Sequence, residues 1–427
     1  MVGHVGNYLF YVLAARALSP AEFADVSAMT ALATIALMPA TGVQAAAARD
    51  TAALLASGRN DDADGLVRRL ARRVGLFQAG LLAVLVLATP AAVAVLDLSS
   101  RSVWLTGAVW LVLGIALQVS LGPLQGRELF GAVGAVLAGP MGAMRPLLLL
   151  PGVALLGVTG ALGALVVATV LGLVGVGLAL RRALSRRRSG RVSLTGIWPA
   201  LAALTAFASL TNADVVAAKI VLDATDAGLY SSAALLGKIA LYAPSALALV
   251  LLPKVTSRLQ AGLDVRRPAL LTLVATLGTG LLVTAVILAA PSSLVSVVFG
   301  PEYRAAYGLA APIAAVMTVA SLLQVHLMVT LASGERTTIV LIAGAAVLQV
   351  TGLALLAETA VHVVLITAAA TGAAVLAHEL VSPFSTVRLL RSGRPRPGDG
   401  GPLLSAGTVP APDRAPPSGR SGDVHES

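Results

Sequence analysis

Two cations, Arg145 and Lys238, lie inside long apolar stretches of the sequence. The guanidinium of Arg145 offers a fork of donors to phosphate or sugar oxygens, and the compact ammonium of Lys238 suits a pyrophosphate or a mobile counter-ion. Each cation also has a structural interpretation. Arg145 could pair with a distant carboxylate or mark a break at Pro140 and Pro146, and Lys238 could pair with Asp214. Arg145 and Lys238 are therefore the first candidates for binding an anion.

Asp214 and His326 could exchange a proton or bind another ion. Histidine titrates near neutrality, and a carboxylate that is removed from water holds a proton more readily. The simpler interpretation of both is structural. Asp214 would then pair with Lys238 or Lys219, and His326 would be a neutral side chain hydrogen-bonded between helices.

The composition requires membrane-spanning elements to carry these groups. Apolar residues make up 57% of the chain and charged residues only 12%, against about 25% charged residues in soluble domains. So few charges cannot cover the surface of a soluble protein of 427 residues without large apolar patches. A soluble enzyme and a disordered protein are both excluded, and a polytopic membrane protein is predicted.

Twelve apolar stretches are long enough to cross a bilayer, whose apolar core of about 30 Å needs about 20 helical residues. Charges or clusters of Gly and Pro separate them. The predicted spans are 2–18, 23–47, 74–96, 103–122, 129–156, 160–180, 197–221, 225–252, 268–290, 305–333, 337–357 and 360–383. We therefore expect an all-α fold with about twelve transmembrane helices.

Lys and Arg are distributed unevenly between the two sides of these spans. Of the 30 basic residues, 24 fall in loops after even-numbered spans or in the C-terminal tail, and four fall on the other side: Arg16, Arg101, Lys219 and Arg304. Cytoplasmic loops of membrane proteins carry an excess of Lys and Arg. This distribution predicts a protein of the cytoplasmic membrane with both termini in the cytoplasm. It also accounts for the net charge of +10 without a nucleic-acid partner.

An internal repeat divides the twelve spans into two halves. Asn7 and Asn212 are 205 residues apart, and Arg16 and Lys219, each at the end of the first span of its half, are 203 apart. Halves with six spans each keep the same orientation, so the pattern indicates a parallel repeat about an axis normal to the membrane. Arg16 and Lys219 would close the outer end of a shared cavity as paired cations, unless they only reach the outer headgroups.

The predicted domains follow from the repeat. An N-terminal six-helix lobe covers residues 1–192, a C-terminal six-helix lobe covers 193–387, and a disordered cytoplasmic tail covers 388–427. The tail is rich in Pro, Gly and Ser and cannot form a packed core.

Two features are expected at the cytoplasmic membrane interface. The amphipathic segment 63–74 carries four arginines on one face, which would hold an interfacial helix on anionic lipids of the inner leaflet. His378 and Glu379, near the end of the last span, are expected at the same interface.

Four segments, taken in order, carry a family resemblance. They are YVLAARALSPAEFADVSAM at 11–29, DVVAAKIVLDATDAGLYSSAALLGKIA at 214–240, VVFGPEYRAAYGLAAPI at 297–313 and LASGERTTIVL at 331–341. Their motifs and spacing resemble the polysaccharide flippases (O-antigen or lipid-linked oligosaccharide flippases) of the multidrug/oligosaccharidyl-lipid/polysaccharide exporter superfamily. The resemblance covers roughly residues 5–385.

The resemblance implies a transporter that flips a polyprenyl-pyrophosphate-linked oligosaccharide across the membrane by alternating access, for the synthesis of cell-surface polysaccharide. It places the substrate in a cavity between two lobes, which rock about it. Coupling to a proton or to sodium is also implied, with Asp214 and His326 as the candidate coupling residues. The candidate cavity residues are Arg145, Lys238, Arg16, Lys219, Asn7 and Asn212.

Two other functions stay open. A drug or organic-cation antiporter of the same superfamily would show an acidic cavity, whereas the charge inside these spans is mostly basic. A membrane-embedded polysaccharide polymerase or ligase would need a large external loop, and every predicted external loop is short. The chain has no Cys, no GxxxxGK[ST] motif and no HExxH motif, so we predict no enzymatic activity, no cofactor and no metal site.

Overall fold

The computed structural model describes residues 2–185, 198–261, 266–333, 335–382 and 385–391, and the regular elements within these ranges are all helices. The first half contains α1 (Val2–Ala17), α2 (Pro20–Ala56), α3 (Asn60–Leu87), α4 (Thr89–Val95), α5 (Arg101–Gly126), α6 (Phe130–Ala138), the π-helical turn η1 (Gly139–Met144) and α7 (Arg145–Ser185). The second half contains α8 (Trp198–Val221), α9 (Ala224–Gly237), α10 (Ile239–Gln260), α11 (Arg266–Ala289), α12 (Ser293–Phe299), the 3-10 turn η2 (Pro301–Ala306), α13 (Tyr307–Ser333), α14 (Thr337–Leu356), α15 (Ala360–Val381) and α16 (Thr386–Arg391). The predicted all-α fold is confirmed.

The helices can be matched to the twelve predicted spans. Nine helical stretches of the described residues are long and apolar enough to span a membrane. One of them, Phe130–Arg181, reverses direction at Gly157 and so supplies two crossings. The other two predicted spans, 2–18 and 225–252, correspond to α1, which has 16 residues, and to the pair α9–α10, which breaks at Lys238; neither is among these nine stretches.

Gly157 makes the reversal within α7 possible. Its φ of 57° and ψ of −135° lie in a region that residues other than glycine rarely adopt. Gly152 and Gly160 then bring the two arms into backbone contact, where a Cβ atom on either residue would collide with the carbonyl group of the other. This hairpin separates the predicted spans 129–156 and 160–180.

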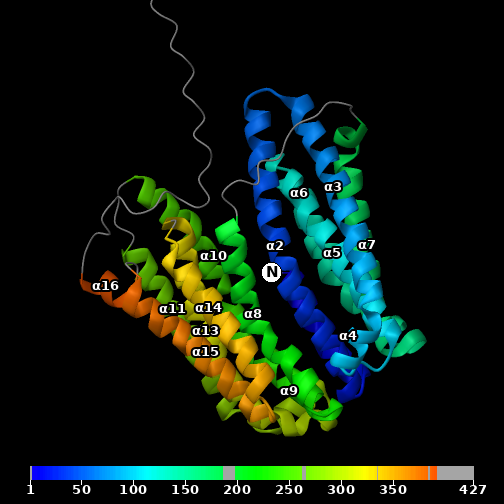
Figure 1. The fold of residues 1–427 in the computed structure, drawn as a ribbon, viewed down its shortest axis with the longest axis vertical. Coiled ribbons are helices and arrows are strands. Elements are labelled where there is room, and N and C mark those ends of the chain that lie inside the picture. The colour runs from blue at the N-terminus through cyan, green and yellow to red at the C-terminus, as the bar shows by residue number, and fades with distance from the viewer. Residues whose placement is uncertain (1, 186–197, 262–265, 334, 383–384, 392–427) are drawn as a thin grey trace, which may run out of the picture.

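The helices form two lobes that lie side by side (Figure 1). One lobe, from blue to green, contains α1 to α7, and the other, from green to orange, contains α8 to α15. The lobes diverge towards the end at which α2 and α7 finish, and they converge at the opposite end near α4 and α9. The diverging end carries most of the loop arginines, so we call it the basic end and the opposite end the far end.

Two predicted boundaries fall largely outside the described residues. These are the lobe boundary at 192/193 and the tail 388–427, of which the structure describes only the last residues of α16, up to Arg391.

Helix α2 contacts both lobes. Within its own lobe, α5 presents Gly122 and Gly126 to the backbone of α2. Small residues of this kind let membrane helices approach closely. On its other side α2 packs along α8 and α9. A capping box between Ser19 and Glu22, with Pro20 in the first turn, fixes where α2 begins at the far end.

The amphipathic segment 63–74 does not form the separate interfacial helix that its pattern predicts. It is the first part of α3, which continues into the third span. Leu66, Val67 and Leu70 from its apolar face are buried, and Val67 and Leu70 pack against other helices of the lobe. Binding of anionic lipid by the arginines of this segment stays a prediction.

Candidate functional site

Arg145 lies where the π-helical turn η1 meets α7, and its side chain is half-buried. One guanidinium NH donates to Asn7 Oδ1 at 2.7 Å, and the guanidinium carbon is 6.0 Å from the ring centre of Trp110. Gly6 packs against the backbone of Gly142 and so fixes α1 beside η1, which brings Asn7 into reach. The partners that hold Arg145 are therefore neutral.

The charge of Arg145 is not neutralised within the part of the chain that the structure describes. No carboxylate of that part forms an ion pair with Arg145. Its Nε–H is buried and has no acceptor among the same residues. A buried donor without an acceptor costs about 1–3 kcal/mol, so this group is suited to a ligand that supplies one.

Lys238, at the break between α9 and α10, is held inside its own lobe. Its Nζ donates to Asn212 Oδ1 at 3.1 Å and lies 3.7 Å from Asp214 Oδ1. Tyr230 in turn donates its hydroxyl to Asp214 Oδ2 at 3.1 Å. All four side chains are buried, and Lys238 is only 7% exposed. The ion pair that we considered for Lys238 and Asp214 is present.

Asn7 and Asn212, which occupy equivalent positions in the repeat, each accept a hydrogen bond from a cation of their own lobe. Asn7 in the first helix of the N-terminal lobe accepts from Arg145, and Asn212 in the first helix of the C-terminal lobe accepts from Lys238. The cations themselves come from different spans of their lobes. The repeat therefore preserves the acceptor and varies the position of the cation.

A second group of contacts joins the lobes at the far end, and we call it the far-end latch. Lys219 on α8 forms an ion pair with Asp25 on α2 at 3.0 Å, with 3% and 1% of the two side chains exposed. Asp25 also accepts from the backbone N–H of Ser99 at 3.0 Å. Arg16 on α1 donates to the carbonyls of Val297 and Val298 in the opposite lobe.

Packing completes the far-end latch. Gly228 on α9 lies against the backbone of Pro20 on α2, where any side chain would collide. The rings of Phe23 and Tyr303 meet edge to face with their centres 5.9 Å apart, and Tyr303 donates to the Leu18 carbonyl at 3.4 Å. Arg16 and Lys219 thus lie at the far end of their spans, where both connect one lobe to the other. That this end faces outward stays a prediction.

His326 lies on α13 near the basic end, with Nε2 3.3 Å from Glu379 Oε1 on α15. It is 3% exposed, and His378 beside it is fully buried. The side chain of His378 contacts Thr338 on α14 and His326 on α13, so it faces other helices of its lobe. The position of His378 and Glu379 at the membrane interface stays a prediction. His326 lies apart from the groups around Lys238, and its role in coupling stays a prediction.

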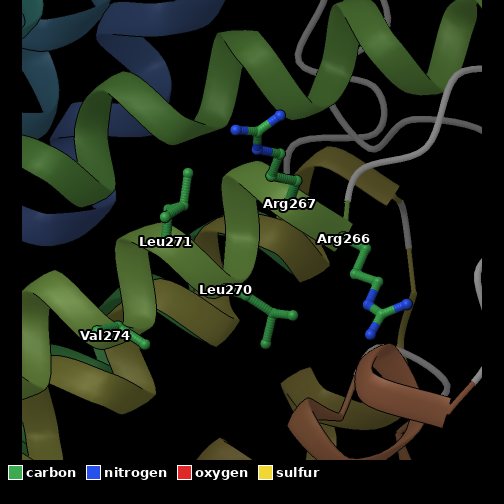
Figure 2. A pocket seen from close by; sticks show the side chains of 5 residues that line it. All are labelled: Arg266, Arg267, Leu270, Leu271 and Val274. Atoms are coloured by element: carbon green, nitrogen blue, oxygen red, sulfur yellow. The ribbon is translucent and has the colours of Figure 1, made fainter.

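A shallow hollow of about 430 Å³ lies at the basic end of α11 (Figure 2). Its lining consists of Arg266, Arg267, Leu270, Leu271 and Val274. Cationic side chains beside leucines are typical of a surface that contacts lipid headgroups. The hollow is lined by one helix of one lobe, so it is separate from the polar groups around Arg145 and Lys238.

Sequence reasoning missed Asp25, Trp110 and Tyr230. Asp25 follows the capping turn of α2, where an acidic residue ordinarily has a local role, and nothing in its neighbourhood points to Lys219. Tyr230 could have been singled out from the sequence, because it lies 205 residues after Asp25 and the repeat has the same interval.

The fold defines the class of protein. The chain is a multi-pass membrane protein with the two-lobed fold of MATE family transporters of the MOP superfamily. Sequence comparison matches it to no protein-family model and to no curated protein. The similarity therefore lies in the arrangement of the helices.

Three solved structures illustrate it. An inward-facing multidrug resistance MATE family transporter of the MOP superfamily is 13% identical, with a TM-score of 0.68 over 91% of this chain and 96% of that one. An outward-facing structure of such a transporter is 13% identical, with a TM-score of 0.57 over 88% and 91%. A MOP superfamily transporter from Pyrococcus furiosus is 13% identical, with a TM-score of 0.55 over 90% and 94%.

Proposed function

We propose that this protein moves an anionic, lipid-linked oligosaccharide across the cytoplasmic membrane by alternating access of its two lobes. The observation that carries the substrate class is Arg145. It is a membrane-embedded guanidinium with neutral partners and one buried N–H that has no acceptor among the described residues. A pyrophosphate supplies the oxygen acceptors and the negative charge that this group needs.

The acidic groups support the same substrate class. Asp25 and Asp214, which could attract an organic cation, are 1% and 0% exposed and lie beside Lys219 and Lys238. The polarity of the binding pocket is not uniform in this fold, since reversed polarity is described for the transporter from Pyrococcus furiosus. A basic site on a MATE-like scaffold is therefore consistent with a distinct substrate.

The arrangement of the lobes supports an inward-facing state. The basic end, which the distribution of Lys and Arg assigns to the cytoplasm, is where the lobes diverge (Figure 1). The far-end latch joins them on the opposite side. The TM-score is also higher with the inward-facing structure, at 0.68, than with the outward-facing one, at 0.57.

A drug or organic-cation antiporter is the second candidate. The observation that favours it is the fold itself, because the similar structures include transporters described as multidrug resistance proteins. Such a substrate would need Asp214 or Asp25 to leave its lysine partner during the cycle.

Binding to purified protein in detergent separates the two candidates. The probes are a short polyprenyl pyrophosphate and tetraphenylphosphonium. We expect the pyrophosphate to bind and Arg145→Ala to weaken it at least about tenfold, because a hydrogen bond to a charged group contributes about 1.5–3 kcal/mol. Arg101→Ala is the matched control, since Arg101 is an exposed arginine at the far end of α5.

The opposite pattern would reject the proposed substrate class. It consists of tetraphenylphosphonium binding that Asp214→Asn weakens, together with pyrophosphate binding that is absent or equal in wild type and Arg145→Ala. The same variants, reconstituted into liposomes, then report whether the bound lipid crosses the bilayer.

A further inference from the structure

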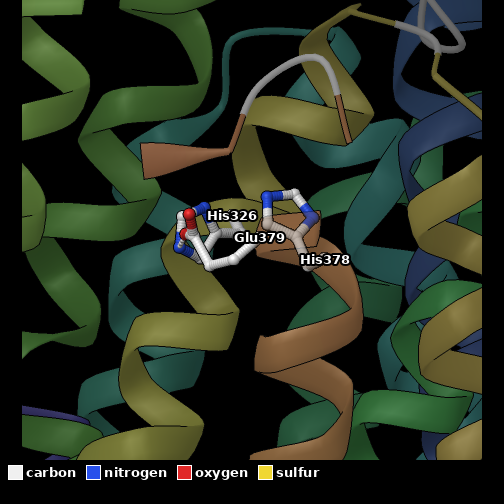
Figure 3. Close-up of side chains that lie close together, drawn as sticks. All are labelled: His326, His378 and Glu379. Carbon is white, nitrogen blue, oxygen red and sulfur yellow. Dashed lines mark ion pairs between the residues drawn. The ribbon is translucent and has the colours of Figure 1, made fainter. Parts of the chain in front are cut away.

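Three side chains with metal-binding atoms lie together at the basic end of the C-terminal lobe (Figure 3). His326 comes from α13, and His378 and Glu379 come from α15. One donor atom of each residue lies within 4.8 Å of the donor atoms of the other two. The described residues contain no other group of three such donors.

The group is built into the protein interior. His326 and His378 are 3% and 0% exposed, and Glu379 is half-buried. Placing three polar side chains in an apolar bundle is costly unless each has a partner. Two imidazoles and one carboxylate form a common donor set for Zn²⁺, which binds them with a fourth position open to water.

Thr338 on α14 determines which nitrogen of His378 carries the hydrogen. Its hydroxyl oxygen is 2.5 Å from Glu335 Oε2 and 3.0 Å from His378 Nδ1. An ionised carboxylate only accepts hydrogen bonds, so the hydroxyl donates its single proton to Glu335 and accepts from Nδ1–H of His378. Nε2 of His378 therefore carries a lone pair, as a metal ligand must. A chain of this kind also orients the imidazole and raises its basicity.

The spacing of the other two ligands fits a tetrahedral ion. His326 Nε2 and Glu379 Oε1 are 3.3 Å apart. Two ligands at 2.0–2.1 Å from a tetrahedral Zn²⁺ are about 3.3 Å apart, so this pair already spans one edge of the tetrahedron. The donor atom of His378 lies within 4.8 Å of the other two, so it would have to move by at most about 1.5 Å to reach the same spacing.

We propose that His326, His378 and Glu379 form a binding site for a divalent transition metal, with Zn²⁺ as the preferred ion. The ion bridges His326 Nε2 and Glu379 Oε1 and so ties α13 to α15. Glu379 also accepts from the backbone N–H groups of Thr386 and Val387 at the start of α16, at 3.0 and 3.2 Å. An ion bound to Glu379 therefore also fixes the segment that leads into the C-terminal tail.

The test measures metal binding to the full chain, purified in detergent with an affinity tag that contains no histidine. After chelation and dialysis, Zn²⁺ is titrated calorimetrically and Co²⁺ is followed by its visible absorption. We expect one ion per chain and a tetrahedral Co²⁺ spectrum. His326→Gln and His378→Gln should remove the site. Thr338→Val leaves the three ligands in place and should weaken binding about 10–100-fold.

His362→Gln is the matched control, because His362 lies at the opposite end of the same helix α15. It should bind metal like the wild type. Thermal unfolding in detergent shows whether each variant is folded before its binding is interpreted. Absence of stoichiometric binding to the wild type, or equal binding by folded His326→Gln and His378→Gln variants, would overturn the proposal.

Discussion

Lys238 shows how a single membrane-embedded charge is accommodated. Asn212 accepts from its Nζ, Asp214 lies 3.7 Å away, and Tyr230 donates to the same carboxylate. Removing one partner of a buried ion pair leaves an uncompensated charge, whereas removing both replaces the pair with apolar packing. The contribution of the pair to stability is therefore visible only in a comparison of single and double variants.

We expect Asp214→Asn and Lys238→Met each to lower the free energy of unfolding by about 3–5 kcal/mol, and the double variant to lose less than either single variant. Unfolding in detergent, followed by the loss of helical circular dichroism, measures this. Asp97→Asn, an exposed change in the α4–α5 turn, is the control and should be neutral. A double variant that loses as much as the two single variants together would show that the two groups do not interact.

The sequence predicts this group better than it predicts the far-end latch. Asn212, Asp214 and Lys238 are unusual residues in apolar spans of one lobe, so their pairing can be proposed from neighbouring helices. Asp25 and Lys219 belong to different lobes, and their contact depends on how the lobes meet. No pattern along the chain encodes that docking.

At the scale of elements, the hairpin in α7 is the feature on which the N-terminal lobe depends. A stretch with the hydropathy of one very long helix folds back at Gly157 and so returns to the basic end. Composition places the spans 129–156 and 160–180 correctly, because helix length is limited by the thickness of the bilayer.

Gly157→Ala tests the hairpin. The backbone of Gly157 has a φ of 57°, so a Cβ atom there should cost about 1–3 kcal/mol of unfolding free energy. Gly163→Ala, in the second arm of the same hairpin, is the control, because nothing lies within 4 Å of the added Cβ atom. A Gly157→Ala variant that unfolds like Gly163→Ala would show that the reversal tolerates a side chain.

The segment 63–74 shows that the sequence predicts a helix and its apolar face but not what that face contacts. Its helix and its two faces are predicted correctly, but an apolar face looks the same whether it packs against lipid or protein. Leu70 is buried because α2 and α5 lie beside it, and only the three-dimensional arrangement supplies those neighbours.

At the scale of the molecule, the far-end latch sets the relation between the lobes. Two cations, Arg16 and Lys219, are used there, and Gly228 allows backbone contact across the lobe boundary. In an alternating-access cycle these contacts must break when the far end opens, and they must form when it closes. Weakening them should therefore favour the state that is closed at the basic end.

Gly228→Leu should shift this equilibrium, because the new side chain collides with the Pro20 backbone. Spin labels at Ser57→Cys and Ser257→Cys, exposed residues at the basic end of the two lobes, report the separation by pulsed electron spin resonance. The chain has no cysteine, so the labels are specific. We expect a shorter distance in Gly228→Leu.

The control for this measurement is Gly278→Leu on α11, where nothing lies within 4 Å of an added Cβ atom. It should leave the distance distribution unchanged. Identical distributions in Gly228→Leu and in the unsubstituted background would contradict a role of the far-end latch in the position of the lobes.

Because α2 is long, a small movement at the far-end latch becomes a larger displacement at the other end of the helix. With 37 residues, α2 extends about 55 Å, well beyond an apolar bilayer core of about 30 Å. Asp25 lies close to one end of it, so a rotation of the whole helix about this residue is amplified at the other end. A tilt of about 10° at Asp25 would carry Ala56 sideways by about 8 Å at 1.5 Å per residue. A change of a few ångströms around one lysine can thus become a larger displacement at the opposite end of the molecule.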